Sequence, residues 1–357
     1  MDDPDAVLDR YFTLTGWSDA LAGAGAARVA VVQRFHRDAL ISRGGVDYVF
    51  RKRGLAAAVA GRAPDVTHVN GLTFPAATWR LRRALPRQTA IVVQNHSDGG
   101  PVGRAPWRQI GGRALRGAVD GFLFAAAGQA DVWRQAGYIA PAQAIYEVMP
   151  ASTTFRPLPR AAAREESRVS GSPALLWVGR LNRNKDPLTV LDGFERALAR
   201  LPGAALTMVY SADDLQSAVR ARVAASPRLS ERVRLVGGVR HERLAAYFSA
   251  ADFFVSGSHH EGSGYALMEA CACGAVPVVT SIPTYRLLTG ESAGQVGALW
   301  TAGDAESFAR ALVDAALRNL DEERARVIAR FEREWSWAAV GRRALDIYED
   351  ATARKSG

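Results

Sequence analysis

The sequence is poor in cysteine and in lysine. Its two cysteines, Cys271 and Cys273, are too few for a zinc framework, which usually needs four ligands. Residues two apart on a helix do not face each other, so we expect two small buried thiols and no disulfide between them. Three of the 45 basic residues are lysines, namely Lys52, Lys185 and Lys355. We therefore give weight to a lysine that falls inside a motif.

Long apolar runs are missing as well. No stretch approaches the roughly 18 apolar residues that a bilayer-spanning helix needs. The first residues, MDDPDAVLDRYF, are acidic and lack the basic and apolar regions of a signal peptide. Hydrophobic residues make up 48% of the chain and charged residues 23%, values typical of a soluble globular protein. These observations predict a cytoplasmic protein.

Acidic residues are scarce in the first half of the chain. Residues 1–160 hold 20 Lys and Arg against 12 Asp and Glu, whereas the remaining residues hold 25 against 24. The net charge of +9 thus comes mainly from the first half, notably from residues 51–53 and 79–87. Such a basic face suits an acidic acceptor, a membrane surface or nucleic acid. A solvated arginine-rich surface without a partner is the simplest alternative.

The length of 357 residues predicts two domains, at roughly 100–200 residues each. In the first half, short apolar runs alternate with helical patterns, which indicates βαβ units and a parallel, doubly wound sheet. A helix is predicted at 14–25, and it leaves no room for the strand that normally precedes it. We expect either a domain that lacks its first strand or a chain that begins downstream of its natural start. The strands predicted in this half are residues 27–35, 66–70, 90–96, 121–126 and 144–149.

Proline, glycine, serine and charged residues cluster at 156–173, which predicts a linker. The alternation of strands and helices then resumes, with helices expected at 186–201 and 241–250. This pattern predicts a second α/β domain of similar size. Its predicted strands are residues 174–179, 205–210, 233–237, 252–257, 276–280 and 297–300.

The stretch HHEGSGYALMEACACGAVPVVT, residues 259–280, predicts a loop, a helix and a strand in close succession after a first strand. The loop follows the carboxyl end of that strand, where open α/β sheets bind ligands. The first N–H groups of the helix lack intrahelical partners, and Gly262 and Gly264 let the backbone approach a ligand. The turn therefore suits a phosphate-sized anion. Glu261 and Glu269 bracket this turn, where they suit the hydroxyl groups of a nucleotide sugar.

A second cluster, LLWVGRLNRNKDP at 175–187, follows another predicted strand. Arg180 and Lys185 lie just after Gly179, in the loop before a helix. Cations beside an anion site suit a diphosphate leaving group, because they neutralise the negative charge that develops on it. The simpler alternative for each of these charged residues is an exposed position on a loop or helix.

Together, the two clusters resemble the retaining glycosyltransferases of family 4, the glycosyl transferases group 1, which have the GT-B fold. The family's two glutamates with seven residues between them are similar to Glu261 and Glu269 in EGSGYALMEACACGAVPVV. Its VGRL element with a following lysine is similar to residues 178–181 and Lys185. The resemblance is specific over about residues 174–302 and weaker before them.

The resemblance implies an α/β protein with two doubly wound, Rossmann-like domains that face each other across a cleft. An acceptor-binding domain is expected at 1–157 and a nucleotide-sugar-binding domain at 172–335. Residues 336–357 would form a helix that returns to the first domain. The glycine-rich loop that the family has after its first strand is not visible here, and Ser263 stands where many relatives have Phe.

The resemblance also implies a role for each matching position. Arg180 and Lys185 would hold the donor diphosphate, Glu261 would contact the donor sugar, and Glu269 would bind the ribose. His96 ends the first-half segment VVQNH and would lie beside the donor sugar, so Glu261, Arg180, Lys185 and His96 are the expected catalytic residues. The further donor-binding positions are Gly179, Val239, Arg240, Gly262, Ser263, Gly264, Tyr265, Ala266 and Leu267.

The implied reaction is the transfer of a sugar from a UDP- or GDP-sugar, with retention at the anomeric carbon and by a front-face route. No metal or other cofactor is expected, because Arg180, Lys185 and the helix dipole would stabilise the leaving group. The expected partners are the nucleotide sugar and an acceptor whose identity the sequence does not give. An anionic or lipid-linked acceptor, and contact of the basic first domain with the inner face of a bacterial membrane, stay open, and no specific nucleic acid is expected.

Three alternatives stay open beside this interpretation. A nucleotide-sugar epimerase or hydrolase would use the same fold. A nicotinamide-dependent oxidoreductase is disfavoured because no G-x-G-x-x-G motif follows an early strand. A non-catalytic nucleic-acid-binding protein would use the basic first half, but no recognised nucleic-acid motif accompanies it.

Overall fold

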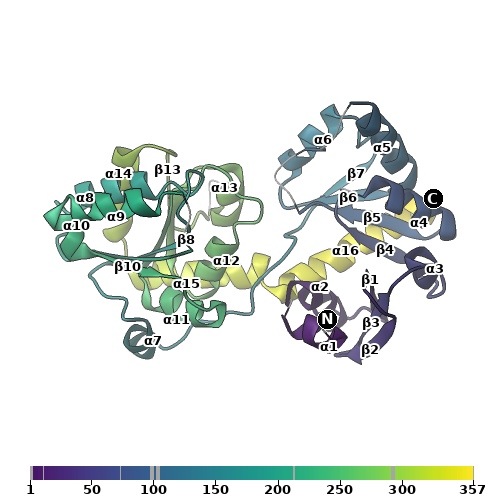
Figure 1. Ribbon diagram of the computed structural model, residues 1–357, viewed down its shortest axis with the longest axis horizontal. Coiled ribbons are helices and arrows are strands. Elements are labelled where there is room, and N and C mark those ends of the chain that lie inside the picture. Colours follow the sequence, from purple (N-terminus) through teal and green to yellow (C-terminus); the bar gives the residue numbers. More distant parts are fainter. Residues whose placement is uncertain are drawn as a thin grey trace. The chain divides into compact units, whose positions relative to one another are not determined.

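The computed structural model describes residues 3–10, 12–72, 74–96, 100–101, 105–211, 214–290 and 294–356. The chain forms two compact units (Figure 1). The first unit comprises Met1–Ser152 and Trp337–Gly357, and the second comprises Thr153–Ser336. Each unit has its own sheets and its own buried side chains.

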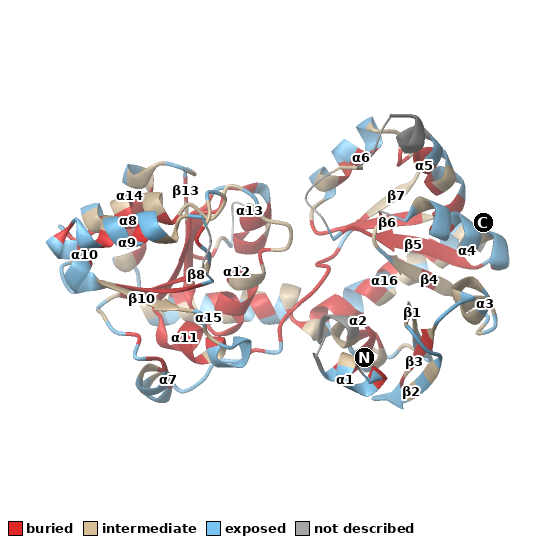
Figure 2. Ribbon diagram, in the orientation of Figure 1, coloured by how far each residue is buried: buried red, intermediate tan, exposed pale blue. Residues whose placement is uncertain are grey.

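The second unit is built on one sheet of six strands, and all of its strand pairs are parallel. All six strands predicted for this half are confirmed. The central strands are largely buried (Figure 2), which explains why their sequences are continuous apolar runs. The strands are β8 (Ala174–Arg180), β9 (Ala205–Ser211), β10 (Val233–Gly237), β11 (Phe253–Ser256), β12 (Val276–Thr280) and β13 (Ala298–Trp300).

The order of these strands reverses at β8. The sheet runs β10-β9-β8-β11-β12-β13, so the chain moves outward from β8 to one edge and then returns to β11 on the other side of β8. Open α/β sheets bind ligands at this switch point, outside the carboxyl ends of the two neighbouring strands. The loops that leave β8 and β11 at this edge are residues 181–186 and 257–264, which carry Lys185, Glu261 and the turn 262–264 among the predicted site residues.

Helices connect the strands and cover both faces of the sheet (Figure 1). The helices predicted at 186–201 and 241–250 are confirmed as α8 (Pro187–Ala197) and α11 (Leu244–Ala250), the latter preceded by a 3-10 turn, His241–Arg243. The other helices of this unit are α7 (Arg160–Ser167), α9 (Gln216–Ala224), α10 (Pro227–Arg232), α12 (Tyr265–Ala272), α13 (Pro283–Thr289), α14 (Ala305–Ala316) and α15 (Leu320–Arg330), which a π-helical turn, Phe331–Trp335, extends.

Helix α12 ends at a glycine, Gly274, as is common for helices. Gly274 has φ +79°, a left-handed conformation that glycine adopts without strain. Its N–H donates to the carbonyl of Cys271, and the N–H of Ala275 donates to the carbonyl of Ala270, which together form a Schellman motif. Cys271 and Cys273 are free and buried, as expected, and burial raises the pKa of each thiol to about 12.

The linker predicted at 156–173 is wrong, because this segment contains helix α7, which packs against α11. Arg160 and Arg164 of α7 form ion pairs with the buried Asp252, which also accepts a 2.7 Å hydrogen bond from the N–H of Ala174. The run of three alanines in RAAAREES favours a helix. The prolines, glycines and serines on either side of this run obscured the signal.

The first unit contains two sheets instead of the single sheet that the sequence predicts. Four of its five predicted strands form a parallel sheet in the order β4-β5-β6-β7. The fifth, predicted at 27–35, is β1 (Val29–Arg34) and belongs to a three-stranded sheet in the order β1-β3-β2. The strands of the parallel sheet are β4 (Val66–Asn70), β5 (Ala90–Gln94), β6 (Gly121–Phe124) and β7 (Ala144–Glu147).

The three-stranded sheet contains a hairpin that the sequence analysis missed. Strands β2 (Ala39–Arg43) and β3 (Val46–Arg51) pair antiparallel around Gly44 and Gly45. Both glycines have positive φ angles, 61° and 81°, which a two-residue hairpin turn of the primed type requires. The Gly-Gly pair between two apolar runs is therefore the signal that predicts this hairpin.

The helices of the first unit include the chain's last helix, α16 (Trp337–Ser356), which packs against α2 (Phe12–Gly23) and β5. Helix α2 confirms the helix predicted at 14–25. The two helices approach closely, since a Cβ on Gly341 would lie 2.2 Å from the carbonyl oxygen of Ala20. No helix among the described residues is both long and apolar enough to cross a membrane. The remaining helices are α1 (Pro4–Arg10), α3 (Leu55–Ala60), α4 (Pro75–Ala84), α5 (Ala105–Ala118) and α6 (Asp131–Gln135).

Candidate functional site

The loop after β8 carries two of the predicted cations. Arg180 is the last residue of β8, and its side chain is exposed. Lys185 ends the following turn, and α8 begins two residues later with Asp186 as its N-cap. Gly179 lies against the ring of Trp177, because a Cβ at this position would be only 3.1 Å from that ring, and it would be in ordinary contact, 3.6 Å, with Cδ of Lys185.

The loop after β11 brings Glu261 to Lys185. Oε1 of Glu261 accepts hydrogen bonds from three donors: Nζ of Lys185, Oγ of Ser258 at 2.7 Å and the hydroxyl of Tyr285 at 2.9 Å. The Lys185 and Glu261 side chains are 21% and 14% exposed, so this ion pair is mostly shielded from water. Among the residues that the structure describes, none donates a hydrogen bond to Oε2 of Glu261. This oxygen therefore remains available to the hydroxyl group of a ligand.

Backbone and side-chain hydrogen bonds fix the two loops to each other. The N–H of His260 donates to Oδ1 of Asn184 at 3.0 Å, and Nδ2 of Asn184 donates to the carbonyl of His260 at 3.1 Å. The N–H of His259 donates to the carbonyl of Asn184 at 2.8 Å. Gly257 permits this approach, because a Cβ there would lie 2.9 Å from the carbonyl oxygen of Asp186. The Lys185–Glu261 pair thus lies on a cross-linked pair of loops.

The glycine-rich turn, residues 262–264, leads directly into α12. Gly264 is the N-cap residue, with φ +63°, and a Cβ on it would lie 2.7 Å from Cδ1 of Leu288. The left-handed backbone conformation therefore favours glycine at 264, and a Cβ there would also displace the end of the Leu288 side chain. The N–H groups of Tyr265, Ala266 and Leu267 belong to the first turn of α12, where helical N–H groups have no intrahelical acceptor and the dipole is positive.

Glu269 lies in the second turn of α12, and its side chain is 7% exposed. Its Oε1 is 2.6 Å from Nε2 of His241. The ring of His241 stacks on Phe155, with the ring centroids 5.0 Å apart and the planes at 29°. The hydrogen bond to Glu269 raises the pKa of His241. The hydroxyl of Tyr265 is buried without a partner among the described residues, and burial raises its pKa to about 12.

The segment that contains the expected donor-binding residues Val239 and Arg240 reaches α12 through His241. Val239 and Arg240 lie between β10 and the turn that begins at His241. Arg240 is exposed and forms a 3.3 Å ion pair with Glu242. The structure therefore joins this segment to Glu269, the residue expected to bind the ribose.

His96 belongs to the first unit, where it follows β5. Its Nε2 is 3.0 Å from Oδ1 of Asn70, the last residue of the neighbouring strand β4. His96 thus lies at the carboxyl edge of its own parallel sheet. Its predicted position beside the donor sugar stays a prediction.

Several residues around Glu261 were missed by the sequence analysis. Tyr285 of α13 is buried, and burial and the nearby Glu261 raise the pKa of its phenol well above the ordinary value. Its hydroxyl lies 2.9 Å from Oγ of Ser256, and Thr284 donates a 2.5 Å hydrogen bond to the carbonyl of Glu261. The available signal was the position of Tyr285 just after β12, the strand next to β11, at the same carboxyl edge of the sheet.

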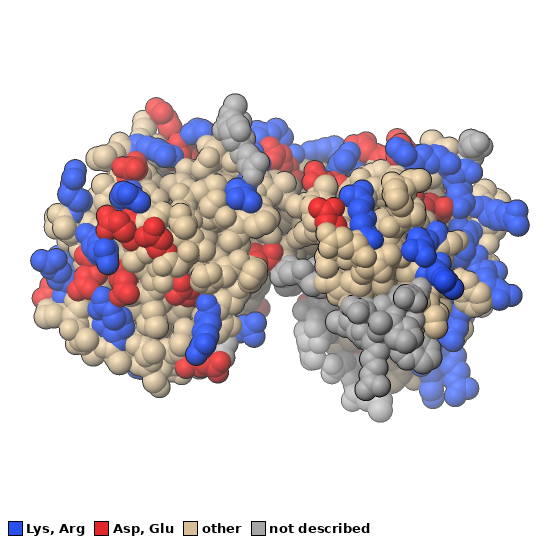
Figure 3. Space-filling view, turned by 90° about the horizontal axis from the view of Figure 1, so that it is seen from above, with Lys and Arg blue, Asp and Glu red and all other residues tan. Residues whose placement is uncertain are grey.

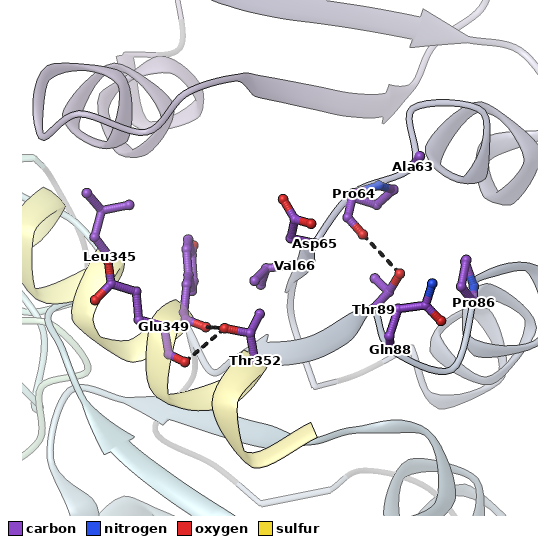
Figure 4. Close-up of a pocket in the computed structure, with 11 residues that line it drawn as sticks. Ala63, Pro64, Asp65, Val66, Pro86, Gln88, Thr89, Leu345, Glu349 and Thr352 are labelled. Atoms are coloured by element: carbon purple, nitrogen blue, oxygen red, sulfur yellow. Dashed lines mark hydrogen bonds between the residues drawn. The ribbon is translucent and has the colours of Figure 1, made fainter. Parts of the chain in front are cut away.

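No metal-binding group is found at this edge among the described residues. The described residues contain no group of three or more His, Cys, Asp or Glu side chains that could hold a metal ion. Figure 4 shows a cavity of about 520 Å³ in the first unit, lined by Asp65 and Thr89 ahead of β4 and β5 and by Glu349 and Thr352 of α16. This cavity lies at the amino ends of β4 and β5, whereas His96 follows the carboxyl end of β5.

Comparison with known proteins agrees with the geometry. Residues 172–317 match the family described as glycosyl transferases group 1. The GDP-mannose:cellobiosyl-diphosphopolyprenol alpha-mannosyltransferase of Xanthomonas oryzae pv. oryzae is 32% identical over 180 residues, which cover 50% of this chain and 47% of that protein. The chain spans about half the length of the curated relatives it matches.

Two solved structures resemble nearly the whole chain. The sucrose-phosphate synthase of Thermosynechococcus elongatus has a TM-score of 0.66 at 20% identity, covering 97% of this chain and 94% of that one. Anabaena HepE in complex with UDP has a TM-score of 0.66 at 15% identity, covering 85% and 86%. At these identities the likeness concerns the fold alone.

The family resemblance found in the sequence is confirmed by the matched segment, and the expected fold is confirmed by the solved structures. The chain has the GT-B fold with two Rossmann-like α/β units. Residues 172–317, which contain Lys185, Glu261 and Glu269, are the segment that matches the glycosyl transferases group 1.

Proposed function

We propose that this chain is a glycosyltransferase that moves a sugar from a nucleoside-diphosphate sugar to an acceptor hydroxyl, with retention at the anomeric carbon. The observation that carries the proposal is the placement of two carboxylates around one glycine-rich turn. The Lys185–Glu261 pair precedes the turn and Glu269 follows it, at the edge where the strand order of the sheet reverses. The match of residues 172–317 to the group 1 family supports the same activity.

In this proposal the diphosphate lies at the N-terminus of α12. The free N–H groups of its first turn, together with Arg180 and Lys185, donate to the phosphate oxygens. Oε2 of Glu261 accepts a hydrogen bond from a hydroxyl of the donor sugar. Glu269 accepts from the ribose, and the loop with Val239 and Arg240 adjoins the base. The mannosyltransferase relative is named for a GDP-sugar and the Anabaena protein was solved with UDP, so both bases belong in a test.

The proposed reaction rests on positioning and on charge stabilisation. The bond between the anomeric carbon and the diphosphate oxygen breaks as the acceptor oxygen attacks from the same face. The departing phosphate oxygen takes the acceptor's proton, so no side chain needs to act as a nucleophile. Lys185 and Arg180 stabilise the negative charge that grows on the diphosphate, a contribution worth about 10² to 10³ in rate for a single well-placed donor in other enzymes. The proposal requires no metal ion.

We further propose that the first unit selects the acceptor and that His96 contributes to the sugar site. The relative from Xanthomonas oryzae is named for an acceptor carried on diphosphopolyprenol, which is both anionic and lipid-linked. An acceptor of this class suits the basic excess of the first unit. We accordingly propose a lipid-linked acceptor and a peripheral contact with a membrane, without a specific nucleic acid.

The test is a titration of the chain with UDP, GDP and their common sugars, with NAD as the control nucleotide. One nucleotide series should raise the melting temperature, and Glu269→Ala should abolish most of that rise. If Glu269→Ala binds the nucleotide as tightly as the unmodified chain, the ribose assignment is wrong. Incubating the preferred donor without acceptor then separates the activities, because rapid release of free sugar or of an epimer indicates a hydrolase or an epimerase instead of a transferase.

A further inference from the structure

Helices α4 and α5 of the first unit carry arginines without acidic side chains. From Phe74 to Val119 the sequence has eight arginines and one acidic residue, and neither helix contains an aspartate or glutamate. The two helices pack together, because a Cβ on Gly111 of α5 would lie 3.2 Å from Cγ of Pro75 in α4. In Figure 3, Lys and Arg side chains gather along the right-hand side of this unit, the side on which Figure 1 labels α4.

Large apolar side chains are exposed beside these arginines. Phe74 is 59% exposed, Trp79 43% and Ile110 57%. Trp79 lies one helical turn from Pro75, on the side of α4 that meets α5, and Ile110 is the neighbour of Gly111 in α5. The guanidinium of Arg83 lies 4.8 Å from the centre of the Trp79 ring. The opposite side of α4 packs into the core through Thr78 and Leu81.

The exposed arginines of this face differ from the other arginines of the first unit. Arg82 points inward, where it donates to the carbonyls of Thr89 and Leu85 and pairs with Asp120. Around the three-stranded sheet, exposed or half-buried arginines pair with aspartates: Arg37 with Asp3, Arg43 with Asp9, Arg51 with Asp38, and Arg62 with Asp47. In contrast, the exposed arginines of the α4 and α5 face have no carboxylate partner among the described residues; they are Arg80, Arg83, Arg87 and Arg113.

We propose that this arginine–aromatic face, made of Phe74, Trp79, Arg80, Arg83, Arg87, Ile110 and Arg113, docks the protein on an anionic lipid bilayer. Anionic headgroups supply the missing partners of the arginines, and each arginine near such a surface contributes about fivefold to partitioning. Trp and Phe side chains prefer the interface between headgroups and acyl chains. Nucleic acid would also attract the arginines, but it offers no apolar layer for Phe74, Trp79 and Ile110.

The test is sedimentation of the full chain with vesicles of phosphatidylcholine alone or mixed with phosphatidylglycerol, at low and high salt. The unmodified chain should bind the mixed vesicles and not the neutral ones. Arg80→Glu with Arg83→Glu should weaken binding at low salt by at least about tenfold. Trp79→Ala should reduce the binding that survives high salt. The matched controls are Arg200→Glu with Arg228→Glu, which change the charge of the second unit equally, and Leu317→Ala, which removes a side chain that is 76% exposed.

Either of two simple results would overturn the proposal: no binding to the mixed vesicles, or equal binding by the variants and the controls. A third would be a combination, in which an excess of random-sequence DNA displaces the protein from the vesicles and Trp79→Ala leaves vesicle binding unchanged. The last result would assign the face to a polyanion such as nucleic acid. Melting curves of each variant show whether it is folded. The proposal rests on the membrane contact proposed above, but its failure is distinguishable from failure of the donor site, because nucleotide binding should be unchanged in all of these variants.

Discussion

Glu261 and Glu269 flank the same glycine-rich turn, but the structure compensates their negative charges differently. Glu261 accepts hydrogen bonds from Lys185, Ser258 and Tyr285, so its partners are a lysine ammonium and two hydroxyl groups. Glu269 is deeper in α12, and its partner is His241, which is a cation only below its pKa. One carboxylate is therefore held by a lysine and two hydroxyl groups, and the other by a single histidine.

This difference indicates two kinds of function at the two ends of the turn. A carboxylate that is fixed by three donors keeps one orientation, as a residue that contacts the reacting sugar requires. A carboxylate that is paired with an exposed histidine can exchange that partner for the hydroxyl groups of a ligand. We therefore expect substitutions around Glu261 to reduce the rate of the reaction, and substitutions around Glu269 to reduce the affinity for the donor.

The largest effect is expected for Lys185→Ala. This substitution removes the cation that compensates Glu261 and, in the proposed reaction, a cation that stabilises the leaving diphosphate. The turnover number for sugar transfer should fall by about 10² to 10³. Lys52→Ala, at an exposed lysine of the first unit, is the control and should leave the rate unchanged. A Lys185→Ala enzyme with normal turnover would remove Lys185 from the proposed mechanism.

The next largest effects are expected for glutamine substitutions of the two carboxylates, which compare Glu261 with Glu269 directly. Glu261→Gln should reduce the turnover number more than the donor affinity, because it leaves Lys185 without its carboxylate partner beside the reacting sugar. Glu269→Gln should weaken the affinity for the nucleotide by about 10-fold, the value of a charge-assisted hydrogen bond, with a smaller change in turnover. Isothermal titration with the nucleotide, together with initial rates of transfer, measures both quantities. Identical changes in the two variants would contradict the distinction between the carboxylates.

Tyr285→Phe tests whether the orientation of Glu261 depends on the full set of donors. The substitution removes one of three hydrogen bonds to Oε1 and should lower the free energy of unfolding by about 0.5–1.5 kcal/mol. The turnover number should fall by less than in Lys185→Ala, because Ser258 and Lys185 still hold the carboxylate. Tyr210→Phe, which loses a 3.4 Å contact with Arg220 at the end of β9, is the matched control in the same unit. Urea unfolding and initial rates provide the two measurements.

The sequence predicted the second unit better than the first for physical reasons. The strands of the six-stranded sheet are mostly buried on both faces, so each is an apolar run bounded by polar residues and turns. The hairpin β2–β3 is partly exposed, and its signal lay in Gly44 and Gly45 rather than in hydrophobicity. Helix α7 was missed because its alanine-rich core is short and lies between breakers of secondary structure.

Among the site residues, too, those with a local sequence pattern were predicted and those that depend on contacts between distant segments were not. Lys185 and Glu261 were singled out because they lie in loops that follow apolar strands, Glu269 because it lies in the helix after the second loop, and all three because they match a family pattern. Tyr285 and the stacking of Phe155 on His241 depend on contacts between segments that are distant in the sequence. No local pattern of residue types encodes such contacts, so one sequence without a structure does not predict them.

The smallest expected effect is a pH dependence of stability that arises from His241. The hydrogen bond to Glu269 raises the pKa of His241 in the folded state, with Glu242 adding to the effect and partial burial opposing it. Because the folded-state pKa lies above the unfolded value of about 6.5, the paired, protonated His241 stabilises the fold fully below that pH, and this contribution is lost as the pH rises through the folded-state pKa.

His241→Gln should therefore flatten the fall of the melting temperature between mildly acidic and mildly alkaline pH, by no more than a few degrees. His36→Gln, at an exposed histidine of the first unit, should leave that fall unchanged. Saturation with the preferred nucleotide should also flatten it in the unmodified chain, because the ribose then replaces His241 as the partner of Glu269. If the nucleotide leaves the slope intact while His241→Gln abolishes it, His241 remains bound to Glu269 in the complex, and the ribose must be held elsewhere.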